Sequence, residues 1–259
     1  MRSASLAFAA GCLLVTPAAA GETPKSVVEL FTSQGCSSCP PADRLASELA
    51  AKGDALVLTL PVDYWDYLGW KDTLANPANS ARQRAYAMSR GDRQIFTPQI
   101  VVNGRESTIG GDEGAVGNAI ARAEKEGGFA LPVDVDIADG RIEVEVEKPR
   151  ASGAAVHGEV WAFAIQRSRE VDISRGENAG RKVAYANVVR HMTRLGSWDG
   201  GPARFEIPTE EVMGPDSDGV AVLVQAGNGG KPGAILGAAR ADVAPPAPTT
   251  TSRLSREPF

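Results

Sequence analysis

The chain has 259 residues and a formal net charge of −5, from 27 Lys and Arg against 32 Asp and Glu. This acidic balance argues against nucleic acid or an anionic membrane as a main partner. Beyond the N-terminus, no stretch is long and apolar enough to cross a membrane. The length predicts about two domains, each large enough for its own hydrophobic core.

The N-terminus has the pattern of a secretory signal peptide. Arg2 gives a positive start, a weakly apolar stretch follows, and Ala18–Ala20 supply small residues before the expected cleavage site. A lipoprotein site at Cys12 is the alternative, but it would leave too short an apolar region. We therefore predict a signal peptide over residues 1–20 and a periplasmic or secreted mature chain.

Residues 21–128 alternate between strand and helix patterns. Apolar runs predict strands, and apolar stripes at helical spacing predict helices. The expected elements are a strand over residues 26–31, a helix over 41–52, a strand over 55–60, a helix over 77–89, strands over 98–102 and 105–109 joined by an Asn103-Gly104 turn, and a helix over 112–127. The predicted order is β-α-β-α-β-β-α around a mixed four-stranded sheet.

A CxxC motif, Cys36-Ser37-Ser38-Cys39, lies between the first predicted strand and the first predicted helix. Two thiols at this spacing can form and break a disulfide with little backbone movement. A thiolate near a helix start is stabilised by free N–H groups and the helix dipole. Pro40 and Pro41 place the regular helix after Cys39, farther from Cys36. The motif predicts a thiol–disulfide exchange site; the alternative is a stapling disulfide, although so small a ring removes little unfolded-state entropy.

The element order, the placement of the CxxC motif and Thr97-Pro98 before the third strand together resemble the thioredoxin superfamily. This resemblance covers about residues 26–127 and implies an α/β thioredoxin-like domain. More closely, residues 28–43 and 97–104 resemble a group of secreted thioredoxin-like proteins described as domain of unknown function 1223. The closer resemblance extends into the C-terminal half and implies no established activity.

The superfamily resemblance implies roles for the two cysteines and for Thr97-Pro98. Cys36 would attack a partner disulfide, and Cys39 would resolve the mixed disulfide. In the superfamily, a proline that is usually cis faces the CxxC motif, and its loop offers backbone groups to an extended substrate. We therefore expect Thr97, Pro98 and the flanking Gln99 to bind substrate; the alternative is an ordinary trans proline at a strand start.

Glu29 lies inside an apolar strand that should be buried on both faces. A lone carboxylate is costly there unless it is paired or protonated. Its position is similar to that of the buried acid that assists proton transfer in thioredoxins, so the resemblance implies a catalytic role for Glu29. The alternative is a structural ion pair with an Arg or Lys.

An aromatic and acidic loop that includes Asp63 and Trp65 follows the second predicted strand. Loops at the carboxyl ends of parallel strands gather around the site in open α/β sheets. We therefore expect Asp63 and Trp65 to form one wall of a substrate groove. The alternative is that the aromatic residues belong to the core.

After residue 128, the sequence changes from alternating strand and helix patterns to strand patterns alone. Alternating apolar and acidic residues around Asp139-Gly140 are typical of a hairpin. Further strand patterns follow, and we predict a small all-β domain over residues 129–243, an antiparallel sandwich of about seven strands. Residues 244–259 are rich in Pro, Thr and Ser and are predicted to form a disordered tail.

We predict no metal and no cofactor. His157 and His191 would complete a formal zinc-binding set with the two cysteines. They lie far apart in predicted strands of the other domain, so this set is disfavoured.

The sequence thus predicts an exported thiol–disulfide oxidoreductase that acts on protein thiols or disulfides through Cys36 and Cys39. The alternative is a secreted binding or structural protein on a thioredoxin-like scaffold, with a non-catalytic disulfide. Exposure and reactivity of Cys36 would distinguish the two. The direction of exchange, the partner and the oligomeric state stay open.

Overall fold

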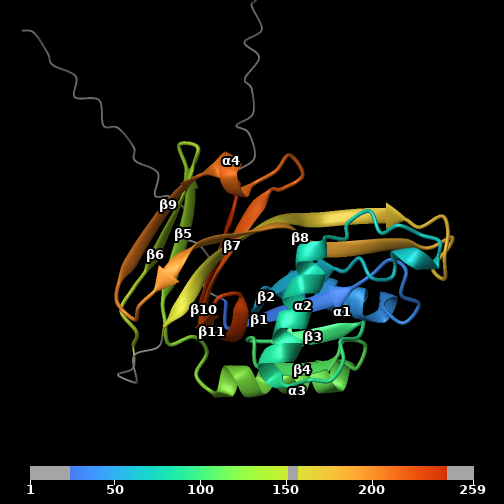
Figure 1. Cartoon of the computed structure of the whole chain (residues 1–259), viewed down its shortest axis with the longest axis horizontal. Coiled ribbons are helices and arrows are strands. Elements are labelled where there is room, and N and C mark those ends of the chain that lie inside the picture. The colour runs from blue at the N-terminus through green and yellow to red at the C-terminus, as the bar shows by residue number, and fades with distance from the viewer. Residues whose placement is uncertain (1–23, 151–156, 244–259) are drawn as a thin grey trace, which may run out of the picture.

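The computed structural model describes residues 24–150 and 157–243 (Figure 1). The predicted signal peptide, residues 1–20, and the predicted tail, residues 244–259, lie outside the described residues. Within the described ranges, no helix has the length and apolar character needed to cross a membrane.

The strands and helices of the N-terminal half occur in the predicted order. They are β1 (Ser26–Thr32), α1 (Pro40–Lys52), β2 (Ala55–Pro61), the short 3-10 helix η1 (Asp66–Leu68), α2 (Pro77–Arg90), β3 (Gln99–Val102), β4 (Glu106–Ile109) and α3 (Glu113–Lys125). Strand β1 pairs in parallel with β2 and antiparallel with β3, and β3 pairs antiparallel with β4. Helices α1 and α3 pack on one face of these strands, and α2 packs on the other.

Local sequence signals explain the helix boundaries. The Asn76 side chain accepts a hydrogen bond from the Ala78 N–H, and Pro77 occupies the first turn of α2. Gly53 and Gly91 end α1 and α2 in the left-handed conformation that favours glycine. Helix α1 begins at Pro40 with Cys39 as its N-cap, so the regular helix starts after the second cysteine, as predicted.

The C-terminal half is built almost entirely of antiparallel strands. They are β5 (Val133–Ala138), β6 (Arg141–Val146), β7 (Gly158–Asp172), β8 (Lys182–Trp198), β9 (Ala203–Pro208), β10 (Gly219–Asn228) and β11 (Lys231–Asp242), with a four-residue helix α4 (Thr209–Val212) that the sequence did not predict. Strands β5, β6 and β9 form a separate three-stranded sheet that packs over β7, β10 and β11. The seven strands from β5 to β11 surround their own apolar core.

The predicted four-stranded sheet is part of a larger one. Its strands continue into the C-terminal half as a mixed eight-stranded sheet in the order β11-β10-β7-β8-β2-β1-β3-β4. The junction is short: Thr59 of β2 pairs with Val188 of β8, and the Thr59 hydroxyl donates to the Ala186 carbonyl at 2.6 Å. The four predicted strands are present, but the sheet has eight strands rather than four, because β2 is covered at its outer edge by a strand from far along the chain.

One apolar core joins the two halves. Phe31 and Leu58 from the N-terminal strands pack in the same cluster as Phe163, Val189 and Leu223 from the C-terminal strands. The cluster therefore crosses the position at residues 128 and 129 where the sequence places a domain boundary. In Figure 1, the long β7–β8 hairpin extends from the sandwich across the N-terminal half, toward the loop that contains η1.

Candidate functional site

The CxxC motif lies at the junction of β1 and α1, where Cys36 and Cys39 form a disulfide with their Cα atoms 5.4 Å apart. The Cys39 N–H donates to the Cys36 carbonyl at 3.2 Å, which closes a tight turn. Cys36 is only 1% exposed and Cys39 is 0% exposed, whereas Ser37 and Ser38 are exposed. The disulfide is therefore formed but shielded from solvent.

A segment between β7 and β8 covers the disulfide turn. The side-chain amide of Asn178 donates to the Gln34 carbonyl at 3.0 Å and to the Cys36 carbonyl at 2.8 Å. Asn178 is itself buried. Its neighbour along the chain, Gly176, approaches Trp70, because a Cβ built on Gly176 would lie 3.2 Å from the Trp70 Cβ. No local signal in the sequence identifies Asn178, which follows Cys36 by 142 positions.

Trp65 links the disulfide turn to Thr97. Its indole N–H donates to the Thr97 hydroxyl at 2.8 Å, and its Cβ would lie 3.2 Å from a Cβ built on Gly35. A glycine before Cys36 therefore lets Trp65 approach the motif closely. Trp65 and Thr97 are both half-buried. The structure thus brings together two of the residues expected at a substrate site.

Pro98 lies beside the first turn of α1. A Cβ built on Gly110 would lie 3.2 Å from the Pro98 Cβ and 3.1 Å from the Ala42 Cβ. The Gly110 N–H also donates to the Pro98 carbonyl at 2.9 Å. The Thr97-Pro98 peptide bond is cis, which the sequence resemblance implied.

Asp63 and Gln99 are occupied by internal contacts. The Asp63 carboxylate accepts a hydrogen bond from the Ser80 hydroxyl at 2.5 Å. Gln99 is 1% exposed, and its amide bonds to Gln83 and Ser107 at 2.8 Å each. The Gln99 side chain is therefore not available to a partner in this structure, because its position in β3 directs it into the interior.

Glu29 is buried and paired. Its carboxylate accepts from the Arg82 Nε at 2.6 Å and from the Tyr86 hydroxyl at 2.5 Å. Burial lowers the pKa of Arg82, but the charges and hydrogen bonds of Glu29 and Tyr86 outweigh it and leave that pKa above its ordinary value. The structure thus contains an ion pair of Glu29 with an arginine, and the second Glu29 oxygen is bonded to Tyr86.

Asp43 is a second buried acid, which the sequence analysis missed. It lies one helical turn after Cys39 in α1, and its N–H donates to the Cys39 carbonyl at 3.1 Å. Its carboxylate accepts from the Thr32 hydroxyl at 2.7 Å. Burial raises the pKa of the Asp43 carboxyl to about 7, against the opposing effect of the Thr32 hydrogen bond. The available signal was an acid inside the apolar stripe of the first helix, next to Ala42 and Ala46.

Asp72 and Tyr185 extend this buried polar region behind the disulfide turn. Asp72 accepts from the Gln34 N–H at 2.8 Å and caps the following turn at Leu74, and burial raises its pKa. Burial also raises the pKa of Tyr185, with further contributions from the charges of Asp43 and Asp72. Two acids that both resist ionisation therefore lie close to the CxxC motif.

The histidines do not join the cysteines. His157 precedes β7 and His191 lies in β8, and both are exposed. Across residues 24–150 and 157–243, no group of three His, Cys, Asp or Glu side chains is arranged to hold a metal ion.

Two solved structures have folds similar to that of this chain. A crystal structure of protein AGR_C_4864 from Agrobacterium tumefaciens is 35% identical, with a TM-score of 0.73 over 85% of this chain and 94% of that one. The structure of HBP35 of Porphyromonas gingivalis is 15% identical, with a TM-score of 0.58 over 91% of this chain and 80% of that one, a likeness of fold alone. No curated protein sequence matches this chain.

The family model described as "Protein of unknown function (DUF1223)" matches residues 27–225. The match begins in β1 and ends in β10, so it includes the CxxC motif, the cis proline and the strands that cover them. The chain therefore belongs to the DUF1223 family.

Proposed function

We propose that this chain is an exported thiol–disulfide oxidoreductase that acts on protein partners through Cys36 and Cys39, with a thioredoxin-like N-terminal half. The observation that most favours this function is the position of the pair: a disulfide at the junction of β1 and α1, with a buried acid one turn later. The β-α-β-α-β-β-α order and the Thr97-Pro98 turn beside α1 support the same proposal.

In the reduced protein, the Cys36 thiolate attacks one sulfur of a partner disulfide. A Cys36–partner disulfide forms, and the other partner sulfur leaves as a thiolate. The Cys39 thiol then loses its proton and attacks the Cys36 sulfur, which closes the Cys36–Cys39 bond and releases the second partner thiolate. Two electrons pass from the cysteine pair to the partner. The reverse sequence oxidises a partner dithiol.

Asp43, rather than Glu29, is the acid that fits proton transfer at Cys39. Residues at positions i and i+4 share one helix face, so the Asp43 carboxyl lies on the Cys39 side of α1. A carboxyl with a pKa of about 7 exchanges protons readily near neutral pH. Glu29 has both oxygens engaged by Arg82 and Tyr86.

A partner chain would approach between the exposed Ser37-Ser38 pair and the half-buried Thr97, with Trp65 as the wall that joins them. Because Cys36 is 1% exposed, the first step requires the segment that contains Asn178 to move away. Loss of two hydrogen bonds would release it from the disulfide turn.

A second candidate function is favoured by this same burial. A binding or structural protein with a non-catalytic disulfide would keep both cysteines shielded, as they are here. Structural disulfides are resistant to reduction, whereas those of exchange catalysts are labile.

The reduction potential of the Cys36–Cys39 pair separates the two functions. The chain without its predicted signal peptide, residues 21–259, is equilibrated in glutathione or thioredoxin buffers, and its free thiols are counted. A potential between roughly −120 and −270 mV, the range of known exchange catalysts, supports the oxidoreductase. A potential below about −300 mV refutes it and supports the non-catalytic disulfide.

A further inference from the structure

We propose that a cavity between α2 and the C-terminal sheet binds a small aromatic carboxylate. The cavity has a volume of about 240 Å³ and lies on the opposite face of β1 from α1, separate from the disulfide. Nothing in the redox chemistry requires it, and the proposal does not depend on the redox proposal.

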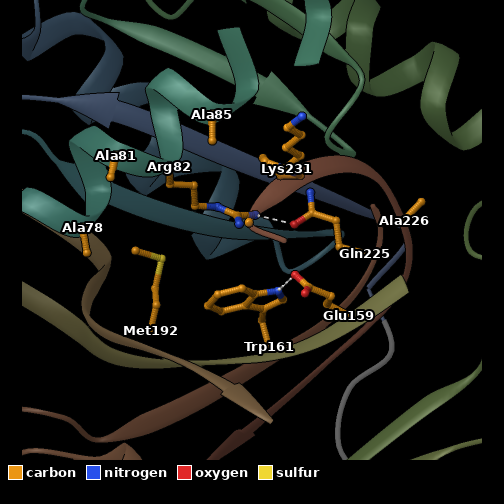
Figure 2. Close-up of a pocket in the computed structure, with 12 residues that line it drawn as sticks. Ala78, Ala81, Arg82, Ala85, Glu159, Trp161, Met192, Gln225, Ala226 and Lys231 are labelled. Atoms are coloured by element: carbon orange, nitrogen blue, oxygen red, sulfur yellow. Dashed lines mark hydrogen bonds between the residues drawn. The ribbon is translucent and has the colours of Figure 1, made fainter. Parts of the chain in front are cut away.

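The walls of the cavity are apolar and come from both halves of the chain. Figure 2 shows Ala78, Ala81 and Ala85 of α2 on one side, with Trp161 and Met192 on the other. Three alanines along one helix face leave open space where larger side chains would fill it. An indole ring and a thioether both make favourable contacts with an aromatic ring. The walls therefore suit an aromatic group.

The floor of the cavity is a charged network. Arg82 reaches from α2 toward Gln225 of β10, and its Nη2 donates to the Gln225 Oε1 at 3.0 Å (Figure 2). Arg82 also donates from the same Nη2 to the Tyr86 hydroxyl at 3.0 Å. Its Nε donates to Glu29. Arg82 is 9% exposed, and among the described residues Nη1 has no hydrogen-bond acceptor. Arg82 lines the cavity, so Nη1 can donate a hydrogen bond to an acceptor on a ligand.

The charges around the cavity favour an anion. Arg82 is balanced by Glu29, and Glu159 is balanced by Arg194, whose Nε lies 2.8 Å from its Oε1. The other Glu159 oxygen accepts from the Trp161 indole N–H at 3.2 Å, so both Glu159 oxygens already accept a hydrogen bond.

Lys231 is the remaining charged residue that lines the cavity. It is exposed on the rim of the cavity, and among the described residues no carboxylate forms an ion pair with it. The paired charges cancel, which leaves one positive charge at the mouth and one guanidinium donor on the floor. A carboxylate complements both groups, and Coulomb attraction draws it to this side of the molecule.

The size of the cavity sets the size of the ligand. An apolar cavity of about 150 Å³ holds one benzene molecule. The 240 Å³ available here therefore accepts a phenyl ring with a short arm that carries the carboxylate. Binding would bury the ring between α2 and Trp161 and place the carboxylate near Arg82 and Lys231.

The test uses isothermal titration calorimetry on the mature chain with 3-phenylpropionate and its neutral isostere, 3-phenylpropionamide. We expect saturable binding of the carboxylate, with about tenfold lower affinity for the amide because it lacks the charge. Equal affinity for the two compounds, or no saturable binding of the carboxylate at millimolar concentration, would overturn the proposal.

Two variants locate the site. Ala81→Leu fills the cavity from an exposed position on α2 with a residue that favours helix, so we expect it to abolish binding while the fold is retained. Lys231→Gln should weaken binding several-fold. Ala121→Leu and Lys125→Gln, at exposed positions of α3, are the matched controls and should bind as the parent does. Unchanged binding by Ala81→Leu places the ligand elsewhere and refutes this site.

Discussion

The Asp43 carboxyl combines complete burial with a hydrogen bond from Thr32 and a position one turn after Cys39. Its protonation in the folded state is therefore linked to folding. In the unfolded chain its pKa returns to the ordinary value of about 3.9. Between that value and the folded-state pKa of about 7, the folded protein binds more protons than the unfolded chain. The free energy of unfolding must then fall as the pH rises through this window.

We expect Asp43→Asn to reduce this pH dependence. The parent protein should lose about 1.4 kcal/mol of stability per pH unit from this group between pH 4 and 7. The amide cannot ionise, so the variant should be more stable than the parent above pH 7. The measurement is denaturant unfolding at pH 4.5 and pH 8. Asp134→Asn, at an exposed position of β5, is the control.

Retention of the full parental slope in Asp43→Asn would contradict the assignment. Asp72, whose pKa is also raised by burial, contributes to any smaller slope that remains.

At the scale of elements, the β7–β8 hairpin reaches the backbone of the disulfide turn, and we expect it to limit access to the disulfide. Its strands are 15 and 17 residues long, and the turn between them positions Asn178 over the backbone of Gln34 and Cys36. Two hydrogen bonds from one buried amide are a local contact that one substitution can remove. The rate at which the disulfide is reduced should therefore respond to that substitution.

We expect Asn178→Ala to speed the reduction of the Cys36–Cys39 disulfide by dithiothreitol by about fivefold or more, because two net hydrogen bonds are worth roughly 1–3 kcal/mol. Thiol release is followed under native conditions, and global stability is measured in parallel. Asn118→Ala, at an exposed position of α3, should leave the rate unchanged. A parental rate in Asn178→Ala would mean that this segment does not limit access.

The elements themselves were largely predictable from the sequence. The helical spacing of apolar residues and capping signals such as Asn76-Pro77 predicted the helices. The β-α-β-α-β-β-α order was correct. The sequence placed Trp65 and Thr97 separately at the expected substrate site, but it did not predict the hydrogen bond between them. The pairing of β2 with β8 was not predictable, because Thr59 and Ala186 are 127 positions apart and the contact leaves no local pattern.

The burial of Cys36 escaped the sequence analysis for the same reason. Local sequence identified the strand-to-helix turn, but the residue that covers it belongs to a distant hairpin. Glu29 was expected to pair with a cation or to act on a thiol, and only the packing of α2 against β1 identifies Arg82 as its partner. Asp43 could have been identified as a buried acid, since its side chain lies on the apolar stripe of α1.

At the scale of the whole molecule, the two halves depend on each other. They share the eight-stranded sheet and one apolar core, and Arg82 of one half bonds to Gln225 of the other. An N-terminal half on its own would expose the edge of β2 and the apolar face that Phe31 and Leu58 contribute to the common core.

We therefore expect a fragment of residues 21–128 to lack a cooperative thermal transition, whereas residues 21–243 unfold cooperatively. Circular dichroism at a fixed heating rate compares the two. A fragment that melts sharply would show that the N-terminal half folds alone and that the shared core is dispensable.

The separation of 142 positions between Cys36 and Asn178 also affects the order in which the two segments are synthesised and folded. Chains are synthesised from the N-terminus, so both thiols emerge well before the segment that will cover them. Contacts over such sequence separations form late, after the loop between them has closed. We therefore expect the thiols to be open to an oxidant early in the life of the molecule, before the completed hairpin encloses the bond.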